Sequence, residues 1–140
     1  HCVSCGNGTD ALYLAMRGLG LLPGDEVITT AHSWISTSET VTQAGGQIVF
    51  CDTRPNTYTI DPSSIEAKVT SRTVGIIPVH LYGQCAGMDP ILAIAKRHGL
   101  VVIEAACQAR WCSIAPRVRF SSMRRPMTPP RAALERRRRV

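Results

Sequence analysis

The first residues that could do chemistry lie near the start of the chain. The run from Cys5 to Leu12 reads CGNGTDAL and places small residues directly before a predicted helix. Backbone N–H groups and the dipole at a helix N-terminus bind phosphate, so this run is a candidate phosphate site. A glycine-rich turn without a ligand is the alternative interpretation.

The same run matches the GxGxxA pattern of dinucleotide-binding oxidoreductases. That fold needs a strand before the loop and an acidic residue at the end of the next strand. In the sequence given, only Val3 and Ser4 precede the loop, and the next predicted strand, residues 26–30, ends in two threonines. A dinucleotide-binding fragment therefore remains only an alternative.

Three other side chains follow predicted strands. Trp34 and Gln108 are expected near the same rim of the sheet. Without further information, Trp34 is as well explained as a buried core tryptophan, and Gln108 as an ordinary polar residue at a strand end. His80 is more typical of a residue that braces its loop than of a catalytic acid or base.

The elements that must position these residues alternate along the chain. Apolar spacing and turn signals predict helices over 9–20, 33–43 and 89–98, a further helix that opens at Asp61-Pro62, and strands over 26–30, 47–51, 73–79 and 100–104. Strands that are apolar on both faces, separated by amphipathic helices, predict an α/β fold with a mostly parallel sheet and helices on both faces. Sites in such sheets lie at the carboxyl ends of the strands.

The charge distribution divides the chain at about residue 109. Residues 1–109 carry six Lys/Arg and nine Asp/Glu, whereas residues 110–140 carry ten Arg and Glu135 alone. The second segment is rich in Arg and Pro and has no periodicity, which predicts an irregular, disordered tail. Such a tail could bind nucleic acid weakly through phosphate contacts, which is a second alternative function. Without interleaved aromatic residues, nucleic-acid binding is not the favoured interpretation.

Several classes of protein are disfavoured by composition. No apolar run is long enough to span a bilayer, so a soluble protein in the cytoplasm is expected, with no membrane partner. The six cysteines are expected to be free thiols, and Cys2 and Cys5 lack the second ligand pair of a zinc site. The chain begins at His1 with no secretory leader, so a missing N-terminal segment is expected.

Taken in order, several segments of this chain resemble the DegT/DnrJ/EryC1/StrS aminotransferases. The resemblance covers about residues 2–109 and is carried by GNGTDAL, PGDEVITT, HSWIST, TYTIDP, IIPVHLYGQ and VIE. It implies a fold-type-I enzyme dependent on pyridoxal phosphate (PLP), usually a homodimer. Such enzymes aminate a keto group on a nucleotide-linked sugar in polysaccharide or deoxysugar biosynthesis, commonly with glutamate as the amino donor.

The resemblance also implies roles for individual residues. Gly8, Thr9 and the backbone of Asp10 match the turn that holds the cofactor phosphate. Trp34 matches the aromatic residue that stacks on the pyridine ring. Gln108 matches the Gln or His near the ring hydroxyl.

Two departures from the family predict that this chain is inactive. Ala105 stands where the family has the Asp that keeps the pyridine nitrogen protonated, and Glu104 next to it should face the other side of the strand. The only lysines, Lys68 and Lys96, lie on helices with exposed charged neighbours, so no nucleophile for a Schiff base is expected near the site. No residue is therefore predicted to be catalytic.

A reading-frame slip near residues 105–112 would explain both the tail and the departures. The codons ATG CGG CGG CCN can encode Met123 to Pro126, and shifted back by one base after a preceding G they read GAT GCG GCG GCC, or Asp-Ala-Ala-Ala. The family has a run of this type at about this distance, ahead of its lysine. The sequence is thus interpreted as an N-terminal fragment of the enzyme with a shifted frame after about residue 109.

Overall fold

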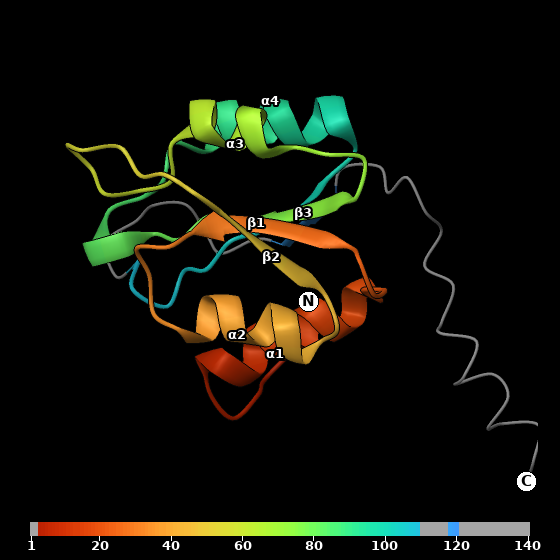
Figure 1. Ribbon diagram of the computed structural model, residues 1–140. Helices are drawn as coiled ribbons and strands as arrows, with labels where there is room; N and C mark the ends of the chain where they lie inside the picture. The colour runs from red at the N-terminus through yellow and green to blue at the C-terminus, as the bar shows by residue number, and fades with distance from the viewer. Residues whose placement is uncertain (1–2, 110–117, 121–140) are drawn as a thin grey trace, which may run out of the picture.

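The computed structural model describes residues 3–109 and 118–120 (Figure 1). Helices and strands alternate along this part of the chain, as the sequence predicts. The elements in order are α1 (Gly8–Leu19), β1 (Glu26–Thr30), α2 (Ser36–Gln43), β2 (Gln47–Cys51), α3 (Pro62–Lys68), β3 (Thr73–Ile77), the 3-10 turn η1 (Leu81–Gly83), α4 (Met88–His98), β4 (Val101–Ile103) and β5 (Val118–Phe120).

The strands form one sheet in the order β2-β1-β3-β4-β5. The pairs β1–β2, β1–β3 and β3–β4 are parallel, and only β5 runs antiparallel, against β4. Helices α1 and α2 cover one face of the sheet while α3 and α4 cover the other (Figure 1). The predicted α/β class, with a mostly parallel sheet and helices on both faces, is confirmed.

The expectation of an irregular segment after residue 109 is wrong at β5. Residues 118–120 pair with β4, with Val118 opposite Ile103 and Phe120 opposite Val101. A three-residue ladder on the free edge of a buried strand needs little sequence signal, which is why periodicity missed it. The rest of the predicted tail lies outside the described residues.

Alternation along the strands divides the interior into two cores. Val27 and Ile77 belong to the core under α1 and α2, whereas their neighbours Ile28 and Ile76 belong to the core under α3 and α4. All four side chains are fully buried. Successive side chains of a strand point to opposite faces, so adjacent apolar residues of β1 and β3 supply both cores.

The helix ends follow capping chemistry that is visible in the sequence. The Asn7 side chain caps α1, which ends at Gly20 in the left-handed conformation. The Asp61 side chain caps α3 ahead of Pro62. The second helix begins at Ser36 and not at Ser33, because a turn in which the Thr37 N–H donates to the Trp34 carbonyl precedes it.

The chain reverses its direction of travel across the sheet between β1 and β3. It passes from β1 to β2 through α2 on one face, and then returns past β1 to β3 through α3 on the other face. Ligand sites of open α/β sheets lie in the crevice at such a switch point, outside the carboxyl ends of the strands. Within the described ranges, no helix is long and apolar enough to cross a membrane.

Candidate functional site

A cavity of about 250 Å³ opens at the switch point. Three parts of the chain line it: the N-terminus of α1, the turn between β1 and α2, and the segments that follow β3 and β4. The sequence-predicted residues Gly8, Thr9, Trp34 and Gln108 all lie on its wall, and Asp10 does not. The remaining lining residues are Asn7, Leu12, Ser33, Ser36, Thr37, Val79, Ala105 and Cys107.

The N-terminus of α1 supplies free backbone donors to this cavity. Asn7 Oδ1 accepts from the Asp10 N–H at 2.9 Å, whereas within residues 3–109 the N–H groups of Gly8 and Thr9 donate to no other residue. These are the unpaired donors of a helix start, which suit a phosphate. The geometry favours Gly8 and Thr9 as phosphate contacts and does not favour Asp10, whose N–H is already used by the cap.

A group of hydroxyls beside these donors was missed by the sequence analysis. Thr9 Oγ1 donates to Ser36 Oγ at 2.9 Å and so links the starts of α1 and α2. Ser33 Oγ and Thr37 Oγ1 lie 3.0 Å apart in the next turn. The run of Ser and Thr from residue 33 to 38 was the available signal, but its proximity to Thr9 depends on how α1 packs against α2.

Gly8 lies close to the side chain of Cys107, in the segment after β4. A Cβ built on Gly8 would lie 2.8 Å from the Cys107 Sγ, well inside normal contact. The glycine therefore leaves room for the start of α1 to lie against the Cys107 side chain in the segment after β4. This contact brings Gly8 and Gln108 to one cavity although they are far apart in the sequence.

Trp34 is exposed on the wall of the cavity. Its side chain is 70% accessible, so the alternative of a buried core tryptophan is wrong. An exposed tryptophan beside a cavity presents an apolar face that a planar ligand could cover. Gln108 is also exposed, and its Oε1 lies 3.5 Å from the Tyr82 backbone N–H.

His80 is a structural residue, as its sequence context predicts. Its ring is fully buried, and its Nδ1 accepts from the Ala86 backbone N–H at 3.1 Å. Because an N–H can only donate, Nδ1 carries no proton, and the Nε2–H donates to Glu104 Oε2 at 3.2 Å. The ring thus holds the loop after β3 to the end of β4.

Glu104 and Ala105 face opposite sides of the sheet. Glu104 points to buried His80, whereas Ala105 packs on the core of α1 and α2 and lines the cavity. The two side chains thus face opposite sides of the strand, as alternation along a strand predicts. The cavity wall therefore carries a methyl group at position 105.

The two lysines lie away from the cavity. Lys68 ends α3 and Lys96 lies near the end of α4, and both helices cover the opposite face of the sheet (Figure 1). Both side chains are exposed. Neither can reach the cavity without passing through the sheet.

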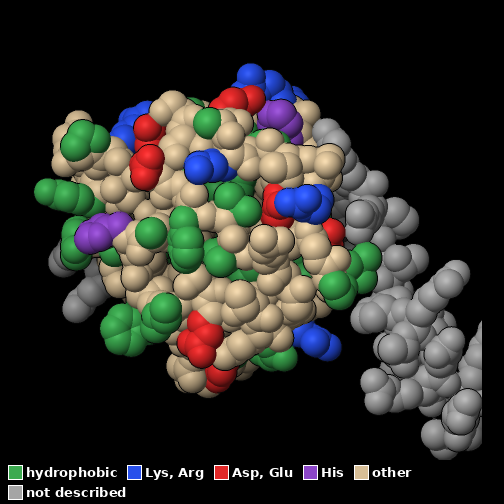
Figure 2. All heavy atoms as spheres, viewed as in Figure 1, with side chains coloured by type: hydrophobic (Ala, Val, Ile, Leu, Met, Phe, Trp, Pro, Cys, Tyr) green, Lys and Arg blue, Asp and Glu red, His purple; other side chains and the backbone are tan. Residues whose placement is uncertain are grey.

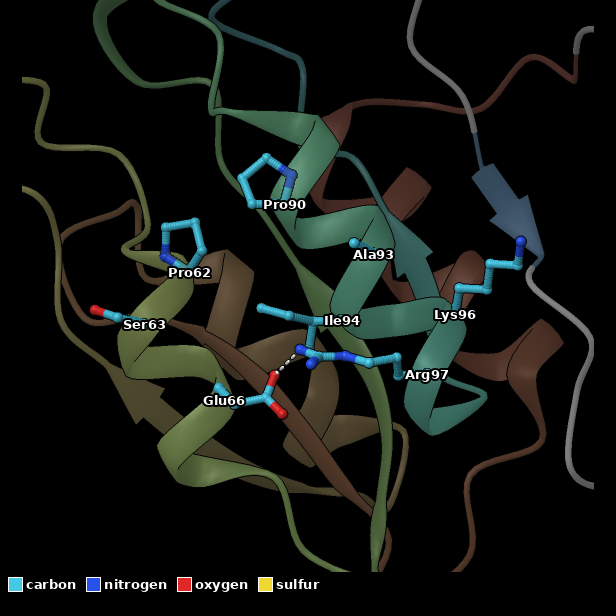
Figure 3. Close-up of a pocket in the computed structure, with 8 residues that line it drawn as sticks. All are labelled: Pro62, Ser63, Glu66, Pro90, Ala93, Ile94, Lys96 and Arg97. Atoms are coloured by element: carbon cyan, nitrogen blue, oxygen red, sulfur yellow. Dashed lines mark hydrogen bonds and ion pairs between the residues drawn. The ribbon is translucent and has the colours of Figure 1, made fainter.

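A larger hollow, about 790 Å³, lies between α3 and α4 (Figure 3). It is an open groove in which Arg97 reaches across to Glu66, with Nη2 and Oε2 2.6 Å apart. His98 Nε2 contacts the other oxygen of Glu66 at 3.0 Å. These exposed charges neutralise one another, and the groove lacks the convergent donors that the smaller cavity has.

The cysteines differ in environment. Cys5, Cys51 and Cys107 are free thiols, but Cys85 is disulfide-bonded, so the expectation of free thiols is wrong at that residue. Burial raises the pKa of the Cys51 thiol to about 12, with smaller contributions from nearby Asp52 and Asp61. Among the described residues, no three His, Cys, Asp or Glu side chains are placed to hold a metal ion.

Comparison with known proteins identifies relatives over most of the chain. The sequence profile of the DegT/DnrJ/EryC1/StrS aminotransferase family matches residues 1–117. The chain is 56% identical to the pleiotropic regulatory protein of Geobacillus stearothermophilus over 109 residues, 78% of this chain and 29% of that protein. It is 51% identical to UDP-2-acetamido-2-deoxy-3-oxo-D-glucuronate aminotransferase of Pseudomonas aeruginosa, covering 78% of this chain and 30% of that enzyme.

A solved structure agrees in both sequence and fold. NtdA from Bacillus subtilis, solved with bound cofactor PMP, is 47% identical and superposes with a TM-score of 0.71 over 74% of this chain and 24% of that chain. The chain thus spans less than a third of the length of the curated relatives described above.

Proposed function

Because the chain belongs to the DegT/DnrJ/EryC1/StrS aminotransferase family, we propose that residues 1–109 are a partial large domain carrying the cofactor half-site of a PLP-dependent sugar aminotransferase. The observation that carries the proposal is the cavity at the switch point, where unpaired helix N–H groups, hydroxyls and an exposed tryptophan meet. The proposed boundary leaves residues 110–140 as a segment rich in Arg and Pro, of which the structure describes only β5, paired with β4.

The residues of the cavity fit the phosphate and the ring of PLP. The backbone N–H groups of Gly8 and Thr9, with the hydroxyl of Ser36 nearby, would hold the phosphate. Trp34 would cover one face of the ring, and the Gln108 amide would meet a polar group on its edge. PLP, when bound, supplies an electron sink for amino transfer.

The same cavity does not fit the catalytic part of that chemistry. Ala105 offers no carboxylate to a ring nitrogen, and neither Lys68 nor Lys96 reaches the cavity wall. Among the described side chains that line the site there is thus no amine to form a Schiff base with the cofactor and no carboxylate to face its ring nitrogen. We infer that this chain binds PLP without catalysing amino transfer.

The substrates of the complete enzyme cannot be inferred from the residues of the half-site alone. We propose a nucleotide-linked keto-sugar as acceptor and an amino acid, glutamate, as donor, in polysaccharide or deoxysugar biosynthesis. The relatives' names support this choice, since one acts on a UDP-linked 3-oxo-glucuronate. We further propose that the complete enzyme is a homodimer in the cytoplasm and that neither a membrane nor nucleic acid is its partner.

The test combines binding with covalent trapping. The purified chain is titrated with PLP by visible absorbance, and the mixture is then reduced with borohydride and mapped by mass spectrometry. We expect saturable binding that is lost in Trp34→Ala and kept in Trp34→Phe, without a stoichiometric pyridoxyl-lysine and without amino transfer from glutamate. A stoichiometric adduct on Lys68 or Lys96 with turnover would overturn the inferred lack of activity.

Binding assays on the same purified chain also test the two alternative functions. Saturable NAD binding without PLP binding would favour a dinucleotide-binding fold. A salt-dependent DNA shift that is lost when residues 110–140 are deleted, again without PLP binding, would favour a nucleic-acid binder. Either result would replace the proposed function.

A further inference from the structure

Three aromatic side chains meet outside the cavity although they come from three different loops. His32 follows β1, Tyr58 lies between β2 and α3, and Tyr82 lies in η1 after β3. The ring centroid of His32 lies 5.8 Å from that of Tyr58 and 6.0 Å from that of Tyr82, and the centroids of the two tyrosine rings are 6.4 Å apart. His32 Nε2 and the Tyr82 hydroxyl are 3.2 Å apart. We call these three residues the aromatic triad.

The aromatic triad is exposed to solvent. Tyr58 is 51% and Tyr82 is 72% accessible, and His32 is exposed as well. Figure 2 shows hydrophobic side chains around a histidine at the left edge of the molecule, where the loops of Figure 1 project from the sheet. Rings that gather at the surface without being buried contribute little to folding, so their clustering calls for another reason.

Both tyrosines also have a strained backbone. Tyr58 and Tyr82 each have φ of 56°, and they are the only non-glycine residues with positive φ among the described residues. A bulky L-residue in this left-handed region is disfavoured. Strain of this kind is typical of ligand-binding and catalytic loops, and here the two strained residues present their rings to the same point.

Two members of the aromatic triad lie next to residues that line the cavity. Tyr82 N–H faces the Oε1 of Gln108, which lines the cavity, and His32 directly precedes Ser33, which also lines it. In the proposed reaction the keto carbon is a member of the sugar ring. The ring must therefore meet the groups at the mouth of the cavity when that carbon reaches the cofactor.

We propose that His32, Tyr58 and Tyr82 are the platform that receives the hexose ring of the nucleotide-linked sugar, an assignment that rests on the proposed function. Aromatic faces suit the apolar C–H faces of a pyranose, while the two phenol hydroxyls and the imidazole can hydrogen-bond its hydroxyls. The strained backbones keep the rings in place before the sugar arrives, which lowers the ordering cost of binding. The aromatic triad is thus a specificity-determining site.

The experiment measures sugar and cofactor binding separately on the full 140-residue chain. UDP-N-acetylglucosamine and GDP-mannose are the probes, with UDP and GDP as matched controls that lack the hexose. Binding is followed by calorimetry and by saturation-transfer NMR on the sugar protons. Tyr58→Gly and Tyr82→Gly remove a ring while accepting the positive φ, and Leu14→Ala removes an exposed side chain from α1.

We expect each tyrosine variant to bind at least one nucleotide sugar about tenfold more weakly than the parent chain does. The affinity for UDP and GDP, the PLP titration, and every affinity of Leu14→Ala should be unchanged. If the parent chain does not bind PLP, the proposed function is wrong. If the tyrosine variants then still bind nucleotide sugars more weakly than the parent chain does, the assignment of the triad as the sugar platform is supported independently.

Three results would overturn the assignment. The parent chain could bind neither nucleotide sugar, or the tyrosine variants could bind both as the parent does. The variants could weaken UDP and the UDP-sugar equally, which would make the triad a site for the nucleotide. Sedimentation could show that the variants convert a dimer into monomers while sugar affinity stays constant, which would make the triad a contact between two copies of the chain.

Discussion

Glu104 and Ala105 are neighbours at the end of β4, yet the carboxylate contacts His80 in one layer and the methyl group lines the ligand cavity in the other. Ala105→Asp should therefore place an acid on the cavity wall without disturbing the buried pair. We expect no amino transfer from this variant, because no lysine reaches the site. A glutamate-dependent transfer assay on Ala105→Asp checks this, with the parent chain as control. In a frame-restored gene, by contrast, an Asp at this position should be required for activity.

The buried pair itself should be a large contributor to stability. Removing one partner of a buried, hydrogen-bonded pair costs about 3 kcal/mol or more, so Glu104→Ala should lower the free energy of unfolding by about that amount. Glu104→Gln keeps an acceptor for the His80 Nε2–H and should cost less. Urea denaturation measures the free energy of unfolding of both variants. If Glu104→Ala and Glu104→Gln lower it equally, the hydrogen bond to His80 does not contribute to stability.

The contact between Gly8 and Cys107 predicts a rescue. Gly8→Ala should destabilise the chain by about 1–3 kcal/mol, the usual cost of overpacking, because the new Cβ would lie 2.8 Å from the Cys107 Sγ. Adding Cys107→Ala removes the sulfur and should restore most of the loss. Thermal unfolding of the single and double variants measures both effects. A double variant no more stable than Gly8→Ala would contradict the contact.

Thiol labelling should report on the cavity. Cys107 lines it and is exposed, Cys5 is exposed elsewhere, and Cys51 is buried with its pKa raised to about 12. Since the thiolate is the reactive form, iodoacetamide should label Cys5 and Cys107 in the native chain and Cys51 only after unfolding. PLP should protect Cys107 and leave Cys5 unprotected. Equal protection of both thiols, measured by mass spectrometry, would argue against binding in this cavity.

Acid should destabilise the amino-terminal end of β1, which lies at the opposite end of the strand from the cavity. Glu26 is buried, and the hydrogen bond from Thr70 and the interactions with Arg72 hold its pKa below the ordinary 4.5. A lowered folded-state pKa means that the carboxylate stabilises the fold above about pH 4.5, and that this contribution is lost as the pH falls through the folded-state value. Urea midpoints between neutral and acid pH should fall less steeply for Glu26→Gln than for the parent chain. Exposed Glu39→Gln, the control, should keep the parent slope.

The frame-slip hypothesis can be tested at the level of DNA. Sequencing the locus should find an insertion or deletion near codons 105–112, with an Asp-Ala-Ala-Ala run and a lysine segment in the restored frame. An intact frame relative to close relatives would end the hypothesis.

The fold was predictable because its signals are local. Caps at Asn7 and Asp61, glycine stops and strands apolar on both faces predict the elements without any knowledge of tertiary contacts. The candidate site was predictable only in part. Gly8 and Trp34 were found from local pattern and resemblance, whereas the link from Thr9 to Ser36 depends on how two helices pack.

The aromatic triad was beyond prediction for a related reason. Nothing in the sequence around Tyr58 or Tyr82 indicates a positive φ, since glycine or asparagine is the usual residue in that conformation. Their convergence on His32 follows from the strand order, which brings the loops after β1, β2 and β3 to one edge. The pattern of a single sequence predicts helices and strands, but it does not show which loops distant in the sequence lie side by side in the fold.

The division of the interior by the sheet has an evolutionary consequence. Val27 and Ile28 are adjacent in sequence but belong to cores on opposite sides of the sheet, so substitutions at the two positions should add in their effect on stability. Ile28 and Ile91 share a core although they are distant in sequence, and their substitutions should be coupled. The layer that carries α3 and α4 can thus accumulate compensating changes without altering the layer of α1 and α2, whose helix starts line the cavity at the switch point.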